Sequence, residues 1–398
     1  MLQLQNFHGL RLKFDLCAPL RSFRSLRSTI PFPIHRNHTI HRLITAKFSA
    51  EHHNFTISYL TDTCGLLPET AIVVSEKVQL HNREKPDSVL ELLESHGFSK
   101  SQISKLVRKR PSLLLASVNQ TLLPKLEFFY SIGASRLVLA RALTSDPTVL
   151  TRSLQNQIIP SYRYLKSVLL SDAKVVAALK RTSWIFLEDH TKTLMPNIDV
   201  LRDEGVPQPC IALLLTHFPE TLMQKTDSFE ETVAEIKGMG FDPSKSTFVL
   251  AIHAISGKGN RSIWNRCYDV YRKWGWTKDE ILMAFRKHPH CMILSEEKIS
   301  KGMEYFTETM GKSAGTIAKT PVVLFFSLEK RIIPRCSVLR VLSARGLVKR
   351  DLSLTTVLLP VEKRFLETFV IKYLDDVPEL MDLYQGNANL DEVLASNF

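Results

Sequence analysis

The feature that most constrains this 398-residue chain is a segment that recurs about every 35 residues. Its clearest copy runs from Gly97 to Gly133, with the sequence GFSKSQISKLVRKRPSLLLASVNQTLLPKLEFFYSIG. It contains a glycine, an amphipathic run, a proline, an apolar stretch, a second proline, another apolar run and a closing glycine. Repetition at this period predicts a solenoid, in which each repeat buries its apolar face only by stacking on its neighbours.

We call the proline after the amphipathic run the anchor of a repeat. The anchors are Pro111, Pro147, Pro219, Pro289 and Pro321, and the corresponding places in two repeats without this proline are Trp184 and Ala254. Successive anchors are 36, 37, 35, 35, 35 and 32 residues apart. We therefore number the repeats from the first, at Pro111, to the seventh, at Pro321, and Pro360 marks a degenerate eighth.

Aliphatic or aromatic residues precede the anchors by eight and by four positions. The set is Ile103, Leu139, Val176, Ile211 and Ile281 at the first spacing, and Val107, Leu143, Leu215, Leu250, Phe285 and Ile317 at the second. A spacing of four residues places both side chains on one face of a helix. The anchor proline then ends this helix, because it has no N–H and disfavours the helical conformation of the residue before it.

A second proline and a glycine complete the repeat. Pro124, Pro160 and Pro334 stand thirteen residues after their anchors, and Pro196 stands twelve after Trp184; a proline suits the first turn of a helix. Glycines stand fourteen residues before several anchors, where a helix would end with positive φ: Gly97, Gly133, Gly205, Gly240 and Gly275. Each repeat is thus predicted as helix A, a proline-led turn, helix B and a glycine cap. The predicted fold class is all-α, a superhelical solenoid of about 35-residue helix–turn–helix repeats.

The run SKLVRKRPSLLL with its partner LLPKLEFFYSIG resembles the repeat of the mitochondrial transcription termination factor (mTERF) family in its plant form. Two flanking segments also resemble that family, the opening FTISYLTDTCGLLPETAIVVSEKVQLHNREKPDSVLELLESHGF and the closing PELMDLYQG. The resemblance therefore spans Phe55 to Gly386. It implies a half-ring superhelix of paired α-helices with a short 3₁₀ segment, and nucleic-acid binding in an organelle. The repeats at Trp184 and Ala254 depart from the proline pattern.

Residues 1–50 are rich in arginine and serine, with eight basic residues and Asp15 as the single acid. This composition predicts an organellar transit peptide, and the density of arginine favours the mitochondrion over the chloroplast. The alternative is a basic arm that binds nucleic acid. We assign 51–96 to an N-terminal helical cap and an incomplete first repeat, 97–374 to the mTERF-like repeats, and 375–398 to an acidic C-terminal tail.

The net charge of +12 is unevenly distributed along the chain. Residues 1–50 contribute +7 of it, which leaves +5 for the rest of the chain. Nucleic-acid binding by the remaining chain therefore has to be argued from the local placement of cations, not from the total charge.

Cations recur in helix A, mostly just before the anchors. They are Lys105, Arg108, Lys109, Arg110, Lys180, Arg181, Arg286, Lys287 and Lys319. Equivalent positions of a solenoid line up along one surface, so we predict a ladder of cations that faces a phosphate backbone. The alternative is that cations in the last turn of a helix only complement its dipole.

Two further basic groups complete the predicted nucleic-acid-binding set. Arg272 and Lys273 lie among aromatic residues, and Arg331, Arg335 and Arg340 lie in a basic stretch after the seventh anchor. Aromatic residues among cations can stack on bases. At helical spacing they are more often core, with Trp274 or Tyr271 as candidate exceptions.

No motif points to an enzyme, a metal site or a cofactor. The six cysteines are at least 24 residues apart and form no CxxC pair, which argues against zinc and against a disulfide framework. Gly311-Lys312-Ser313 lacks the first glycine of a phosphate-binding loop. No apolar run reaches the roughly 18 residues needed to span a bilayer, so we expect no membrane insertion.

By the resemblance, we expect a monomer that binds double-stranded DNA and regulates transcription, through termination, in an organelle. Organellar transcription or splicing proteins are candidate partners. The nearest alternative is RNA binding, in organellar intron splicing or ribosome assembly. Two other solenoids remain alternatives: a pentatricopeptide array, whose repeats lack the two prolines, and a protein-interaction array of the tetratricopeptide kind.

Overall fold

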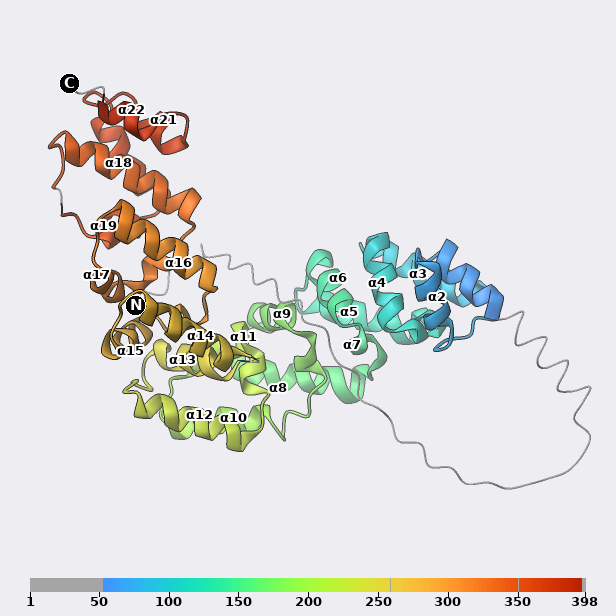
Figure 1. Ribbon diagram of the computed structural model, residues 1–398. Coiled ribbons are helices and arrows are strands. Elements are labelled where there is room, and N and C mark those ends of the chain that lie inside the picture. Colours follow the sequence, from blue (N-terminus) through green and yellow to red (C-terminus); the bar gives the residue numbers. More distant parts are fainter. Residues whose placement is uncertain (1–52, 258, 350, 396–398) are drawn as a thin grey trace, which may run out of the picture. The chain divides into compact units, whose positions relative to one another are not determined.

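The computed structural model describes residues 53–257, 259–349 and 351–395 (Figure 1). These residues lie in one compact unit, His52–Phe398. They fold into helices and turns, without a β-strand in any described range, and the predicted all-α helical-repeat solenoid is confirmed. The predicted transit peptide, residues 1–50, lies outside the described residues. The predicted boundaries between cap, repeats and tail stay predictions.

Helix A ends just before the anchor in every repeat except the fifth. In chain order the helices A are α4 (Lys100–Lys109), α6 (Arg136–Ser145), α9 (Asp172–Arg181), α11 (Gln208–His217), α13 (Ser246–Ser256), α15 (Lys278–Lys287), α17 (Ala314–Lys319) and α19 (Leu354–Leu358). Several begin with a hydroxyl residue whose oxygen accepts a backbone N–H of the first turn. In α4, Ser99 and Gln102 form a reciprocal capping box, which satisfies two otherwise unpaired amides.

A short turn follows each anchor. These turns are η2 (Pro111–Leu115), α7 (Thr148–Thr151), η5 (Ser183–Phe186), η6 (Pro219–Leu222), η7 (Pro289–Ile293) and η9 (Pro321–Phe325). The residue before the anchor leaves the helical region, as Arg110 does with φ −140° and ψ 72°. This is the conformation that a following proline favours, so the proline both ends helix A and starts the turn.

Helix B follows the turn. The helices are α5 (Leu123–Ser131), α8 (Ile159–Leu169), α10 (Leu194–Asp203), α12 (Thr226–Gly238), α14 (Asn260–Lys273), α16 (Glu296–Glu304, continued by η8, Tyr305–Thr309) and α18 (Ile333–Ala344). The predicted glycine caps are confirmed, for example at Gly133 with φ +91°.

The second proline lies at the start of α5, α8 and α18, as predicted, but the helical path begins one turn earlier. The preceding π-turns are η3 (Val118–Leu122), η4 (Leu154–Ile158) and η10 (Leu328–Ile332). Pro124 has no N–H to donate, and the N–H of Leu123 bonds the carbonyl of Val118, five residues back. The missing donor therefore gives a π-turn at this place, and Ser117 caps it.

Additional helices lie at both ends of the repeats. Three helices come before the repeats: a helix over 53–62, α2 (Pro68–Ser75) and α3 (Glu84–Ser95). Of these, α3 packs on η2 as a helix B would. After α19 come α20 (Glu362–Phe365), η11 (Leu366–Val370), η12 (Ile371–Tyr373), α21 (Leu380–Gln385) and α22 (Leu390–Ala395). The last two lie within the predicted acidic tail, contact α18, and bury Leu380, Leu383 and Val393.

The anchor of the third repeat is Ser183 and not Trp184, which corrects the sequence alignment by one residue. The turn η5 begins at Ser183, which is buried like the anchor prolines, whereas the side chain of Trp184 is 50% exposed. The shift by one residue also explains which apolar side chains of α9 are buried. Val175 and Leu179, eight and four residues before Ser183, are fully buried, and the predicted Val176 is only partly buried.

The anchor predicted near Ala254 does not exist. Ala254 lies buried inside α13, which continues to Ser256, and α14 begins at Asn260 without an intervening 3₁₀ turn. Because no proline interrupts it, helix A of this fifth repeat continues to Ser256, and Gly257 caps it. The side-chain amide of Asn260 then donates to the carbonyl of His253 at 2.8 Å and so caps the end of α13.

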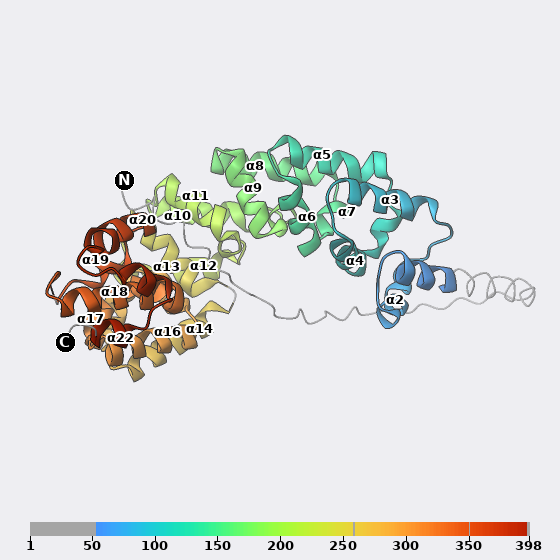
Figure 2. The same cartoon turned by 90° about the horizontal axis from the view of Figure 1, so that it is seen from above.

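Helices A stack directly on one another along the chain, and helices B reach the turn of the following repeat. Consecutive contacts link α4, α6, α9, α11, α13, α15 and α17. Likewise α8 contacts η5, α10 contacts η6, α14 contacts η7 and α16 contacts η9. In Figure 1, α10 and α12 lie side by side, and each also contacts helix A of the following repeat, α11 and α13 respectively. Figure 2 shows the same succession of helices from above.

Polar side chains of helix B, or of the π-turn that leads into it, bond carbonyls of the next turn or, at Leu358, of the end of α19. We call these side chains turn bridges. The bonds join Lys125 to Leu150, Gln157 to Phe186, Asn197 to Leu222, Tyr271 to Cys291, Lys298 to Phe325 and Arg331 to Leu358. Short 3₁₀ turns leave carbonyls without a helical partner, and burying them unpaired would cost free energy. The turn bridges satisfy them and hold each repeat to the next.

The corrected register predicts opposite effects for two proline substitutions. Thr182 has φ −152° and ψ 128°, which suits a residue before proline, so Ser183→Pro should leave stability unchanged or raise it by up to about 1 kcal/mol. Trp184→Pro removes the N–H that bonds the Thr182 hydroxyl and forces Ser183 out of the turn conformation. It should cost at least about 1 kcal/mol in a denaturation experiment, and the reverse order would contradict the Ser183 anchor.

Candidate nucleic-acid interface

The predicted cations before the anchors lie at the C-terminal end of helix A, and most are exposed. Exposed members are Lys105, Arg108, Lys109, Arg110, Lys180, Arg181, Arg286, Lys287 and Lys319. Because helices A stack in register, equivalent residues of neighbouring repeats lie at the same edge of the stack. The side chains differ, however, in what they already contact.

Lys109, Arg181 and Lys287 each bond the end of helix A in the following repeat, and we call them cross-repeat caps. Lys109 donates to the carbonyls of Thr144 and Ser145, at the end of α6. Arg181 Nε lies 2.8 Å from the carbonyl oxygen of His217. Lys287 Nζ lies 2.9 Å from the corresponding oxygen of Lys319.

The last carbonyls of a helix have no intrahelical partner, and the helix dipole makes its C-terminal end negative. A cation there stabilises the structure without any ligand. The sequence left two alternatives for these cations, phosphate binding and complementation of a helix dipole. Each of the two applies to these side chains in part, with one difference. The helix dipole that each cation complements belongs to the next repeat and not to its own helix.

Three further cations of the predicted set bond the protein in other ways. The guanidinium of Arg110 donates to the hydroxyl of Thr148 at 2.9 Å, in the next turn. Arg286 donates to the carbonyl of Met239 at 3.3 Å, and Arg272 to that of Trp276 at 2.7 Å. These contacts use part of each guanidinium and leave the exposed remainder available.

The side chains free to meet a phosphate are a smaller set. Lys105, Arg108, Lys180, Lys273 and Lys319 are exposed, and none of these side chains has a hydrogen bond or ion pair within the described ranges. Arg340 is half-buried. An exposed cation without an intramolecular partner breaks no bond within the protein when it contacts a phosphate. These residues are therefore the best candidates for the interface.

Arg331 and Arg335 serve the fold, in contrast to the prediction that they bind nucleic acid. Arg335 is 1% exposed and donates to the carbonyls of Val357, Leu358 and Pro360. Its guanidinium carbon lies 4.5 Å from the ring centroid of Phe365. Arg331 bonds the same helix end and stacks on Phe326 at 4.3 Å. Arginine side chains are usually exposed, so the sequence favoured a surface position for both. The packing of α19 on α18 is what covers them.

The aromatic residues near Arg272 are core residues for the most part. Tyr271 is fully buried, donates to the carbonyl of Cys291 and stacks on Trp276 at 4.2 Å. Tyr271 is therefore no candidate for base stacking, and Trp274 is half-buried against the core. The exposed indole is that of Trp184, which the repeat pattern identifies only as an anchor position.

Histidines near the fifth repeat add no positive charge at neutral pH. His253 stacks on Phe218 at 3.9 Å and lies 5.3 Å from the ring of His290. Burial lowers the pKa of His253 to about 3 and that of His290 to about 4. Both rings are neutral at the pH of an organelle and serve packing across the repeat that lacks its turn.

An acidic surface covers part of helices B. Asp203 on α10 and Asp227, Glu230 and Glu231 on α12 are exposed, without an ion pair or hydrogen bond from any residue that the structure describes. The two helices contact each other, so these carboxylates lie on neighbouring elements. Their like charge disfavours phosphate there and leaves the anchor edge as the favoured side.

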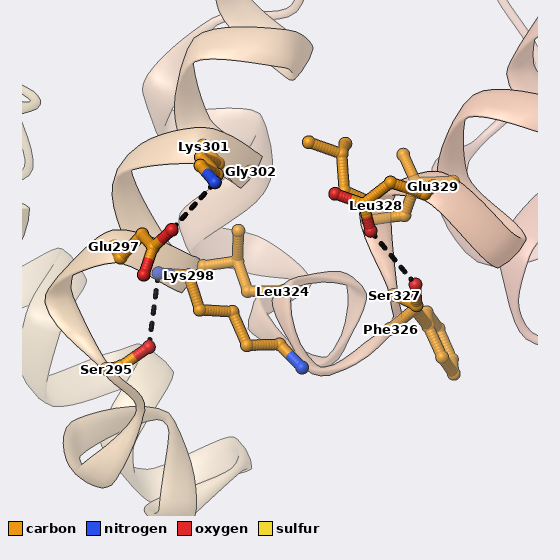
Figure 3. A pocket seen from close by; sticks show the side chains of 11 residues that line it. Ser295, Glu297, Lys298, Lys301, Gly302, Leu324, Phe326, Ser327, Leu328 and Glu329 are labelled. Carbon is orange, nitrogen blue, oxygen red and sulfur yellow. Dashed lines mark hydrogen bonds and ion pairs between the residues drawn. The ribbon is translucent and has the colours of Figure 1, made fainter.

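The cleft in Figure 3 lies between α16 and the turn of the seventh repeat. Leu324, Leu328 and Ile332 are among its apolar lining residues, whereas Glu297, Lys301 and Glu329 bring charges of both signs. Glu297 and Lys301 pair with each other at 2.7 Å. Positive and negative charges around the cleft offset each other and do not favour an anion. We therefore do not place the nucleic acid in this cleft.

The described residues contain no group of three or more metal-ligating side chains. Within the same ranges no helix is both long and apolar enough to cross a bilayer. The described cysteines are buried free thiols, at positions 64, 210, 267, 291 and 336.

Comparison with known proteins gives a family match. The family model described as mTERF matches residues 90–255 and 253–366. The chain is 30% identical over 105 residues to "Transcription termination factor MTERF15, mitochondrial" of Arabidopsis thaliana, which covers 26% of this chain and 24% of that protein. It is 22% identical over 174 residues to "Transcription termination factor MTERF8, chloroplastic" of the same plant, covering 44% and 34%. The matches thus span about a quarter to a third of these relatives.

Proposed function

Because the chain belongs to the mTERF family, we propose that it binds nucleic acid in an organelle and regulates expression of the organellar genome there. The observation that carries this proposal is the recurrence of exposed cations at equivalent places in the stacked helices A. Among the side chains that the structure describes, no arrangement suggests a reaction, and we propose a binding protein without enzymatic activity.

The proposed substrate is double-stranded DNA, and the proposed role is transcription termination. The names of both relatives support this role, since each is a transcription termination factor. The interface consists of Lys105, Arg108, Lys180, Lys273 and Lys319, with the exposed parts of Arg110, Arg181, Arg272, Arg286 and Lys287. These cations displace counterions from phosphates, so affinity falls as salt rises.

We propose the mitochondrion as the compartment. The arginine-rich composition of residues 1–50 supports an organellar address, and one relative is mitochondrial by name. The other relative is chloroplastic by name, and the chloroplast is therefore the alternative.

RNA binding is the second candidate, and one observation favours it. The exposed Trp184 follows the exposed cations Lys180 and Arg181 of the third repeat within four residues along the chain. Indole rings stack on unpaired bases, which RNA offers more often than a closed duplex does. Intron splicing or ribosome assembly would then be the role.

Crosslinking in isolated mitochondria separates the two candidates. The protein would be crosslinked, purified and sequenced together with its bound nucleic acid, with DNA and RNA kept apart. Enrichment of DNA at one locus would support termination, and enrichment of intron or ribosomal RNA would support RNA processing. Recovery of neither would leave a protein-interaction solenoid as the better account.

A charge reversal tests the interface directly. Lys105→Glu with Arg108→Glu changes exposed side chains that bond nothing within the described residues, so the fold should persist. We expect roughly tenfold weaker binding of duplex DNA, and a plot of log affinity against log salt that is flatter by about 2. Fluorescence anisotropy at several salt concentrations measures both.

Lys77→Glu with Lys85→Glu is the matched control. These lysines are exposed in or near α2 and α3, outside the repeats, and carry the same change of charge. An equal loss of affinity in both double variants would show a general charge effect and would remove Lys105 and Arg108 from the interface. Lys109 and Arg110 are left unchanged because they also hold the first repeat to the second.

A further inference from the structure

Trp184 is presented to solvent by a rigid turn. Its neighbours Ser183, Ile185 and Phe186 in η5 are buried, and the last two are fully so. The N–H of Trp184 bonds the hydroxyl of Thr182, and its carbonyl accepts the N–H of Leu187 at 2.8 Å. The backbone is thus held on both sides while half of the large apolar side chain stays in water.

Exposure of this indole is unusual within the chain. Trp276 is completely buried, and Trp264 stacks on Tyr268 with ring centroids 5.7 Å apart. One residue after the anchor, the first, second and fourth repeats have Ser112, Thr148 and Glu220, and the sixth, seventh and eighth have His290, Val322 and Val361. The fold therefore does not require an aromatic residue at this position, and leaving one exposed forgoes burial free energy.

Two cations accompany the indole. Lys180 and Arg181 end helix α9, only a few residues before Trp184, and both are exposed. Lys180 bonds nothing that the structure describes. Arg181 bonds the carbonyl of His217 through Nε, and its guanidinium carbon lies 5.8 Å from the ring centroid of Phe218, while the residue stays exposed. The nearby Asp189 is neutralised by Lys192 at 3.1 Å. A flat apolar ring can stack on a base, and cations near the ring can contact the phosphates on either side of that base.

We propose that Trp184 stacks on an unpaired nucleobase whose flanking phosphates contact Lys180 and Arg181. This rests on the proposed nucleic-acid binding and goes beyond the proposed duplex, because it requires an unpaired segment in the bound nucleic acid. A paired base inside a closed duplex offers no free face to an indole. Single-stranded RNA and single-stranded DNA both offer one, and stacking alone does not distinguish them.

The test measures affinity of the full chain for three probes: an RNA strand, a DNA strand of the same sequence, and the corresponding DNA duplex. Trp184→Ala should weaken binding of the single strands by about 5- to 100-fold, and that of the duplex by less than about twofold. Comparison of the RNA and DNA strands shows which source supplies the base. Binding of the wild type to oligouridylate should also quench tryptophan fluorescence, and Trp184→Phe should lose this quenching.

A matched pair separates stacking from apolar bulk. Trp184→Phe keeps an aromatic face and should retain most of the single-strand affinity, whereas Trp184→Leu keeps only bulk and should behave like Trp184→Ala. Equal affinity of all variants, or an equal loss on duplex and single strand, would overturn the stacking role while the proposed function stands. Failure of the wild type to bind any probe would instead overturn the proposed function.

Discussion

Replacement of Arg335 by methionine is expected to destabilise the C-terminal repeats by about 2 kcal/mol, because it removes the buried donor of the Val357 carbonyl and leaves the carbonyls of Leu358 and Pro360 to Arg331 alone. Arg335 is 1% exposed and bonds the carbonyls of Val357, Leu358 and Pro360, with its closest contact to Pro360 at 2.7 Å. Burial lowers the pKa of Arg335, which shows that desolvation already disfavours its charge. Methionine preserves the apolar stem and removes only the guanidinium.

Arg340→Met is the control, since Arg340 lies on the same helix, is half-buried and donates no hydrogen bond within the described residues. It should change stability by less than about 1 kcal/mol. Repeat proteins can unfold in parts, so amide hydrogen exchange over 354–395 is the sharper measurement. Similar exchange rates in both variants would show that Arg335 does not hold α19 and the closing helices in place.

Phe129→Ala is expected to cost about 3–5 kcal/mol, the range for a large aromatic residue removed from a core. Phe129 lies on α5 and is fully buried. Its ring centroid is 5.4 Å from that of Phe186, in an edge-on arrangement at 79°. Phe186 belongs to the turn of the third repeat, whereas α5 belongs to the first. The cavity would therefore open an interface between repeats, and denaturant unfolding followed by circular dichroism should detect it.

The adjacent Phe128 provides the comparison. It is half-buried and meets Tyr162 at 5.4 Å, so Phe128→Ala should cost clearly less than Phe129→Ala. If the two variants had equal stability, the inter-repeat contact of Phe129 with Phe186 would contribute little. A change in the denaturant slope as well as in the midpoint would indicate that the repeats have lost cooperativity.

Local chemistry explains why helices and turns could be predicted. Pro111 ends a helix wherever it stands, because its ring removes a donor and restricts the residue before it. Gly133 adopts φ +91° because only glycine does so without steric cost. Where the proline is missing the prediction was wrong, by one residue at Ser183 and by a whole turn at Ala254. A serine has no such restriction, and the burial of its neighbours determines the register.

The candidate interface was predictable only as a list of cations. Arg108 and Lys109 are adjacent in the sequence and both are exposed, yet Lys109 bonds the end of α6 and Arg108 bonds nothing that the structure describes. Which of two neighbouring cations faces another helix depends on how the repeats stack. Trp184 was missed for the same reason, since its exposure follows from the placement of η5 and not from its residue type.

The sequence by itself determined the repeat, its period, the order of helix and turn, and the family, because proline, glycine and apolar spacing act over a few residues. Only the tertiary structure decided what each polar side chain does. Carbonyls at helix ends and turns need donors, and those donors come from the preceding repeat, some 20 to 36 residues earlier, as with Tyr271 to Cys291 and Lys109 to Ser145. Stacking thus assigns some cations to the fold and leaves the others for a ligand.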